Sequence, residues 1–226
     1  MSPRSSRILV FAFAFAVFII LPAFLSQPFP GYPLMHVADT FDLLTPFVLI
    51  TAYWLLFVDA AGSPDRRWTV AFLLLATLWV SGQAMHLAAN SINNLLGEGS
   101  GDVHTLVHFY DEVLSHYLWH AGILGLSALL VAAETSGGPA PARGWMIGVA
   151  AILYGLTYFL AVNEGGTVPL GLPGAAAMVV WLLARGRSGR PLASFFFAAY
   201  ALALVLLLGW GLYWKGFPEF TEVGLL

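Results

Sequence analysis

Residues His104–His120 read HTLVHFYDEVLSHYLWH, and an apolar run continues from them to about Ala133. This stretch holds most of the six histidines of the chain and two adjacent carboxylates. At about 100° per residue on a helix, the polar side chains gather on one half of the surface. They are His104, Thr105, His108, Asp111, Glu112, Ser115, His116, Trp119 and His120, with Phe109 as the clear misfit among them. A polar face at the mouth of a membrane helix predicts a buried site with metal-ligand chemistry.

Composition places the chain among integral membrane proteins. Its 226 residues are 59% hydrophobic and only 9% charged, and the mean hydropathy is +0.82. The absence of cysteine excludes disulfides, thiolate nucleophiles and cysteine-based zinc or iron–sulfur sites. Any metal must therefore be held by nitrogen and oxygen. No basic cluster suggests a nucleic-acid partner.

Seven apolar runs are long enough to cross the roughly 30 Å hydrocarbon layer of a membrane. They lie at about 7–26, 40–60, 68–92, 103–133, 143–163, 168–185 and 192–214. The connections between them are short, so the sequence predicts a single transmembrane domain over 1–226, an all-α polytopic helical bundle. Alternatively, Arg4 and Arg7 form the positive region of a signal peptide, and cleavage of the first run leaves six spans.

Orientation follows from the lysines and arginines. Every basic residue except Lys215 falls on the same side of the predicted bundle. Basic loops stay in the cytoplasm, so we expect the N-terminus inside and the C-terminus outside. The histidines then lie on the non-cytoplasmic side or in the outer halves of the spans. The acidic residues lie in the same regions, apart from Asp59, Asp65 and Glu134.

Ionisable and amide side chains from four spans are expected to meet at one depth. A helix rises about 1.5 Å per residue, so depth can be compared between spans by counting from their ends. The residues that come within about two turns of one another are Asp39, Asp42, His86, Asn90, Asp111 to His116, Asn163 and Glu164. Because each such group needs a partner, a cavity or an ion, we predict one buried site that faces the non-cytoplasmic side.

Roles within this site follow from residue type and spacing. Histidines four apart present imidazoles on adjacent turns, as helical metal sites require. The candidate metal ligands are His86, His108, Glu112, His116 and His120. The candidate catalytic carboxylates, which ligate the metal, orient a histidine or act as general base, are Asp111, Glu112 and Glu164. The candidate supporting residues are Asp39, Asn90, Ser115 and Asn163.

The alternative to a metal or proton-active site is a polar network that only holds the helices together. For His36 and His104, the two interpretations are about equally favoured. For a metal, the nitrogen and oxygen donors favour zinc or iron, and copper is also compatible.

The segment His116-Tyr-Leu-Trp119-His120 resembles the His-x-x-Trp-His element of the superfamily that joins alkaline ceramidases with the progestin and adiponectin receptors. This resemblance implies seven spans, a zinc ion and, in several members, hydrolysis of lipid amides. In that family the element lies in the last span, whereas here it lies in the fourth. The family also has a serine four positions before a histidine, where Gly82 precedes His86 in this chain. The His-x-x-x-His spacing is similar to that of membrane di-iron hydroxylases and desaturases, whose His-x-x-His-His boxes are absent here.

These patterns favour a metal-dependent membrane enzyme, a hydrolase or oxygenase that acts on a lipid or other hydrophobic small molecule. Alternatives are an ion- or proton-coupled transporter that uses the same cluster, and a structural subunit of a membrane complex. The sparse polar residues in the inner halves of the fourth, fifth and sixth spans disfavour transport. A haem carrier, with His86 and His116 as axial ligands, is a further alternative. The oligomeric state is left open.

Overall fold

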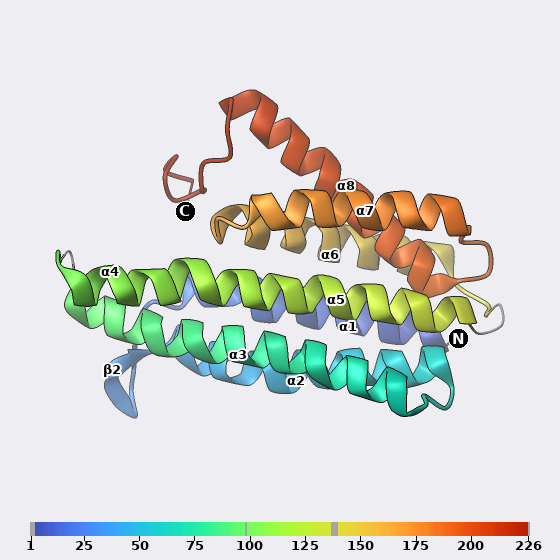
Figure 1. Ribbon diagram of the computed structural model, residues 1–226, viewed down its shortest axis with the longest axis horizontal. Helices are drawn as coiled ribbons and strands as arrows, with labels where there is room; N and C mark the ends of the chain where they lie inside the picture. The colour runs from blue at the N-terminus through green and yellow to red at the C-terminus, as the bar shows by residue number, and fades with distance from the viewer. Residues whose placement is uncertain (1–2, 98, 137–139, 226) are drawn as a thin grey trace.

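The computed structural model describes residues 3–97, 99–136 and 140–225, and it confirms the all-α bundle (Figure 1). Seven helices within these residues are long and apolar enough to cross a membrane. The elements are α1 (Pro3–Ile20), the 3₁₀ turn η1 (Leu21–Phe24), β1 (Pro28–Phe29), β2 (Tyr32–His36), α2 (Val37–Ala61), α3 (Arg66–Leu96), α4 (Asp102–His108), the π-helical turn η2 (Phe109–Leu114), α5 (Ser115–Ser136), α6 (Gly144–Glu164), α7 (Val168–Arg185) and α8 (Pro191–Trp214). The chain is thus an integral, multi-pass membrane protein. Its helices begin and end within a few residues of the predicted spans.

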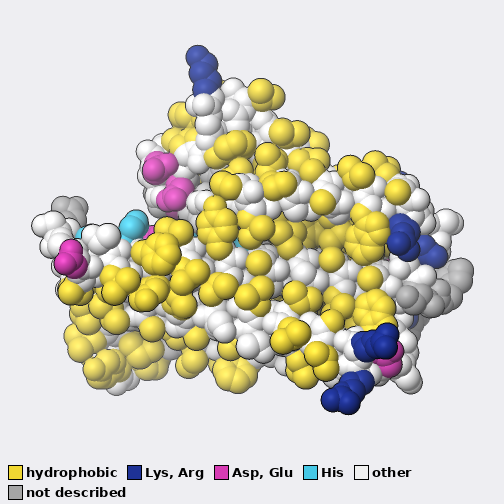
Figure 2. Space-filling model, viewed as in Figure 1, with side chains coloured by type: hydrophobic (Ala, Val, Ile, Leu, Met, Phe, Trp, Pro, Cys, Tyr) yellow, Lys and Arg dark blue, Asp and Glu magenta, His cyan; other side chains and the backbone are white. Residues whose placement is uncertain are grey.

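The helices pack in pairs around a common apolar core. Helix α3 lies along α5, α6 lies along α8, and α1 contacts α6. Figure 1 shows α8 running obliquely across α6 and α7. In Figure 2, hydrophobic side chains cover the middle of the visible face, while most Lys and Arg side chains lie at one end. This surface is the one expected for a bundle surrounded by lipid, with its charges at the two water boundaries.

The basic residues gather at the end where α1 begins, here called the arginine-rich end. The three acidic residues predicted to lie at this end, Asp59, Asp65 and Glu134, each have polar partners there. Asp59 pairs with Arg7, and Asp65 accepts hydrogen bonds from two backbone N–H groups at the start of α3. Glu134 is 1% exposed and accepts hydrogen bonds from the N–H groups of Leu192 and Ala193, at 3.0 and 2.8 Å. These carboxylates therefore cap helices and pair with arginines.

The histidine-rich segment His104–His120 departs from a regular helix between Phe109 and Leu114, where η2 interrupts it. A π turn inserts about one extra residue into the helical repeat and so rotates the residues on either side of it. Phe109 is 45% exposed on the outside of the bundle, whereas Asp111 is fully buried. The Ser115 hydroxyl donates to the Asp111 carbonyl inside this turn. The single misfit on the helical wheel thus marks the position where the helix widens.

Close contact between α3 and α5 depends on Gly82. A Cβ added at this position would lie 2.6 Å from the Ser115 carbonyl oxygen and 2.6 Å from the Trp119 nitrogen. Both neighbours are backbone atoms, which cannot move aside as a flexible side chain can. Position 82 is therefore restricted to glycine in this bundle.

We expect Gly82→Ala to destabilise the protein by about 1–3 kcal/mol, because overpacking forces the two backbones apart. Gly148→Ala on α6 is the matched control, since nothing lies within 4 Å of its added Cβ. Elsewhere in a helix, Gly→Ala is neutral or stabilising. Thermal unfolding in detergent should show a lower Tm for Gly82→Ala only. Equal Tm values in the two variants would contradict this account of the α3–α5 contact.

Candidate functional site

The site is built on a contact between α3 and η2. Nδ1 of His86 lies 2.9 Å from Oδ1 of Asp111, which is ion-pair distance, although neither atom has a well-aligned hydrogen bond in the described chain. The other carboxylate oxygen lies 3.5 Å from Nδ2 of Asn93. Because Asp111 is fully buried, its charge depends on these two neighbours. The π turn is what brings the carboxylate to them.

His116 lies beside His86, with their ring centroids 4.9 Å apart. Its Nδ1 is 3.0 Å from the backbone carbonyl oxygen of Glu112 and 3.8 Å from Oε2 of the same residue. A carbonyl oxygen only accepts hydrogen bonds, so Nδ1 of His116 carries the proton. In a neutral ring, Nε2 then carries the lone pair.

His120 continues the row, one turn further along α5. Its Nδ1 lies 2.6 Å from the Thr167 hydroxyl, which also lies 3.3 Å from the Val162 carbonyl. If the hydroxyl proton goes to that carbonyl, the Thr167 oxygen accepts the Nδ1 proton of His120. The Nε2 atom of His120 is fully buried and has no partner among the described residues. The Trp119 ring stacks on His120, at a centroid distance of 4.8 Å.

Gly165, just after α6, allows this row of rings to pack against the backbone. A Cβ there would lie 3.2 Å from Cε1 of His120 and 3.3 Å from Nδ1 of His116. Any larger residue would push one of the two imidazoles away from its partner. This close approach ties α6 to the histidines of α5.

A cavity of about 750 Å³ opens beside His86 and His116. Polar side chains supply much of its wall and come from α2, α3, α4, η2, α5, α6 and the segment after α8. They are Asp42, His86, Asn90, His108, Glu112, His116, Tyr117, Trp119, Glu164, Glu219 and Thr221. The four spans for which we predicted polar side chains at one depth therefore all contribute residues to the cavity wall.

Other predicted residues lie outside this cavity. Asp39 accepts a hydrogen bond from the His36 N–H at 2.8 Å and so caps α2. Ser115 bonds within its own helix, and Nδ2 of Asn163 donates to the Pro218 carbonyl at 2.8 Å. Asp111 and His120 are buried behind the cavity wall. From these positions, both residues can support the wall of the cavity.

The segment after α8 returns to the cavity, which the sequence did not reveal. Oε2 of Glu164 accepts hydrogen bonds from the N–H groups of Phe220 and Thr221, at 2.7 and 3.4 Å. Nε1 of Trp210 donates to the Pro218 carbonyl at 2.9 Å. Together with Asn163, these contacts bring Glu219 and Thr221 to the cavity. Much of the Glu164 carboxylate is therefore used to hold the C-terminal segment.

A second polar cluster, also unforeseen, lies in the centre of the bundle. The hydroxyl of Tyr154 lies 3.0 Å from that of Tyr53, 3.1 Å from that of Ser127 and 3.3 Å from that of Tyr200. Tyrosine packs as an aromatic residue and seldom stands out in an apolar span. Ser127, seven residues beyond His120 on the same face of α5, was the available signal.

The donors around the cavity are nitrogen and oxygen atoms, as zinc and iron require. Across the described residues, however, no three His, Asp or Glu side chains are grouped closely enough to hold a metal ion. Glu112 is the side chain best able to complete such a group. It is 41% exposed and can change rotamer without disturbing the core.

Comparison of the chain with known protein families, curated proteins and solved structures finds no match in any of the three.

We expect docking of the C-terminal segment to weaken as the pH rises. Burial, followed by the carboxylates of Glu164 and Glu222, raises the pKa of Glu219 above the ordinary glutamate value of 4.5. Glu112 adds to this effect, and His108 opposes it. A raised pKa means that the docked segment binds the proton more tightly than the free segment does, so the stabilisation is present at low pH and lost above the raised pKa.

Hydrogen exchange at Phe220 and Thr221, corrected for intrinsic rates, should therefore be faster above the raised pKa than below it. Glu219→Gln should abolish the difference, since the amide resembles the protonated acid. An unchanged pH dependence in that variant would assign the effect to another group.

Proposed function

We propose that this chain is a metal-dependent membrane enzyme. The observation that carries the proposal is the common anchoring of three imidazoles. His86, His116 and His120 each place Nδ1 against an oxygen atom, of a carboxylate, a carbonyl and a hydroxyl respectively. Metal-ligating histidines typically have this arrangement, in which the partner of one ring nitrogen fixes the ring and leaves the other nitrogen for the metal.

Nε2 of His86 and Nε2 of His116 are the first two ligand atoms in this proposal. Both rings lie on the cavity wall. The Glu112 carboxylate, 3.8 Å from the His116 ring, supplies the third ligand after a change of rotamer. His108 on α4 also lines the cavity and can complete the set. Three protein ligands with one open position are typical of catalytic metal sites.

Asp111 and Glu164 take positioning roles. Asp111 orients the His86 ring and increases its basicity, as carboxylates behind metal-ligating histidines do. Glu164 holds the C-terminal segment against the cavity. The general base is then Glu112 or a group that faces the cavity with it. When bound, zinc or iron, or copper, supplies activated water or oxygen and polarises the substrate.

The substrate class in this proposal is a lipid or another hydrophobic small molecule, and the membrane side is the non-cytoplasmic one. The depth of the cavity supports the first inference, because it lies between membrane-length helices. The gathering of arginines at the opposite end of the bundle supports the second.

Elemental analysis of detergent-purified protein, prepared without chelator, tests the proposal. We expect stoichiometric zinc or iron in the wild type and loss of the metal in His116→Ala, which removes one ligand. His104→Ala is the matched control, since His104 lies on α4 and outside the cavity lining. Metal retained in His116→Ala would remove this residue from the ligand set. No metal in the wild type would reject the proposal.

A specific observation also favours a second function, proton-coupled transport. His120, Ser127 and Glu134 follow one another seven residues apart on α5, and each is at most 1% exposed. Seven residues bring a helix back to the same face, about 10 Å further along. The tyrosine hydroxyls surround the middle member. Polar groups thus continue from the cavity toward the arginine-rich end, where the sequence suggested none.

Proton flux into vesicles that contain the purified protein and an internal pH-sensitive dye distinguishes this second function. If transport occurs, Tyr154→Phe should slow the flux because it removes the hydroxyl that joins three others. Tyr158→Phe is the control, since its hydroxyl donates only to the Gly171 carbonyl. Flux no faster than in empty vesicles would reject transport and leave the enzyme proposal.

A further inference from the structure

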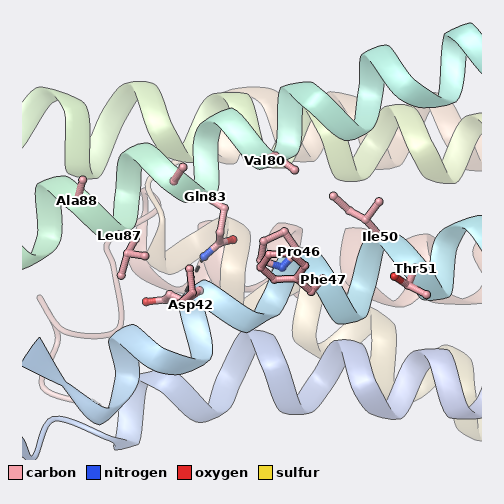
Figure 3. A pocket seen from close by; sticks show the side chains of 11 residues that line it. Asp42, Pro46, Phe47, Ile50, Thr51, Val80, Gln83, Leu87 and Ala88 are labelled. Carbon is pink, nitrogen blue, oxygen red and sulfur yellow. Dashed lines mark hydrogen bonds between the residues drawn. The ribbon is translucent and has the colours of Figure 1, made fainter. Parts of the chain in front are cut away.

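A second hollow, of about 470 Å³, lies between α2 and α3 on the lipid-facing side of the bundle. Its lining is almost entirely apolar, and Figure 3 shows Pro46 and Phe47 from α2 between the two helices. The lining residues, here called the α2–α3 groove, are Asp42, Leu43, Pro46, Phe47, Ile50, Thr51, Val80, Gln83, Ala84, Leu87 and Ala88. Phe47 is 68% exposed and Leu43 is 50% exposed, so the groove opens toward lipid.

The groove spans the depth of one membrane leaflet. From Asp42 to Thr51 it follows α2 for about 14 Å, at 1.5 Å per residue. Half of the hydrocarbon layer is about 15 Å. Asp42 lies five residues from the start of α2, so the groove begins near the histidine-bearing end of the bundle and ends near its centre. One lipid chain that runs parallel to the helices matches this length and direction.

The end of the groove at Asp42 and Gln83 is polar and leads into the cavity. Nε2 of Gln83 donates to Oδ1 of Asp42 at 3.2 Å, as the dashed line in Figure 3 marks. Gln83 is only 2% exposed, and its Oε1 has no partner among the described residues. Pro46, one turn after Asp42, has no N–H to donate to the Asp42 carbonyl. Asp42 lines the groove and the cavity alike.

We propose that the α2–α3 groove binds the hydrocarbon chain of an amphiphile whose polar head passes Asp42 and enters the cavity. This inference rests on the proposed function and names the substrate class of the same site. The unpartnered oxygen of Gln83 accepts a hydrogen bond from the head. Apart from Thr51, the rest of the groove is lined by apolar side chains, which suit an apolar chain.

Charge selects among amphiphiles. The cavity wall carries the carboxyl groups of Asp42, Glu112, Glu164 and Glu219, and the described chain places no Lys or Arg on it. Repulsion from these groups disfavours phosphate and carboxylate heads. An uncharged head avoids this repulsion, and the unpartnered acceptor of Gln83 favours a head that donates hydrogen bonds, so the occupant assigned to the groove is an amphiphile of this kind, such as a long-chain alcohol.

Photocrosslinking in vesicles tests this assignment. The probe is a long-chain alcohol with a diazirine in mid-chain, at low density in phosphatidylcholine vesicles that contain the full-length protein. The comparison probes are the fatty acid and the phosphatidylcholine that carry the same diazirine chain. Peptide mass spectrometry locates the adducts. We expect the alcohol to label residues 42–51 and 80–88, and the two anionic or phosphate-bearing probes to label the lipid-facing surface without preference.

Two variants separate the groove from the surrounding lipid contact. Ala84→Trp fills the groove and should reduce labelling to the level of the general surface. Leu74→Trp, at a position 67% exposed on α3 and outside the groove, should leave the labelling unchanged. Labelling spread evenly over all exposed faces in the wild type, or unchanged in Ala84→Trp, would overturn the assignment.

Metal content of the same samples keeps this inference distinct from the proposed enzyme. Ala84→Trp should retain the metal of the wild type, because residue 84 lines the groove and not the cavity, although His86 follows two residues later on α3. Groove labelling in a protein without metal would support the lipid site and reject only the metal-dependent chemistry. Labelling of the groove by phosphatidylcholine, equal to that by the alcohol, would overturn the selection by charge.

Discussion

Inside a membrane, a charged side chain is not hydrated and must find its polar partners within the protein. This constraint organises the histidine-bearing half of the bundle. The buried carboxylate of Asp111 is the clearest case, since it depends on His86 and Asn93 from another helix. The π turn between α4 and α5 delivers it to them. His116 and His120 follow the same rule, each with Nδ1 against an oxygen atom. His86 and His116 line the wall of the cavity, and the less constrained Glu112 lines it with them.

The same constraint explains the small residues at the helix contacts. The polar partners come from different spans, so the backbones must approach closely for short side chains to meet. Gly82 permits this between α3 and α5, and Gly165 permits it between α6 and the imidazoles. The cavity, the α2–α3 groove and the central hydroxyl cluster then lie along one continuous set of packed helices. Asp42 joins the first two, and α5 carries polar groups from the cavity to Ser127 and Glu134.

The spans were predictable from sequence because length and hydropathy decide what crosses a membrane. The residues lining the cavity were largely predictable too, since a constant rise per residue fixes their depth, as for Asp42, His86 and Glu112. The π turn was only signalled by the misfit of Phe109, because periodicity averages over an inserted residue. Pairings between distant segments were not predictable. No local pattern links Glu164 to the amide of Phe220, or Tyr53 to Tyr154, since those contacts depend on how the chain returns after α8 and how α2 meets α6.

The proposed ligand site requires that oxygen contacts hold the proton of each buried histidine on Nδ1 and leave Nε2 for a ligand. Nitrogen-15 NMR of the imidazole rings, in lipid-reconstituted protein with specifically labelled histidine, tests this requirement. Loss of individual signals in His116→Ala and His120→Gln assigns them. We expect both rings to carry their proton on Nδ1, with Nε2 either unprotonated or shifted by a metal. Rings protonated on Nε2, or on both nitrogens, would contradict the requirement.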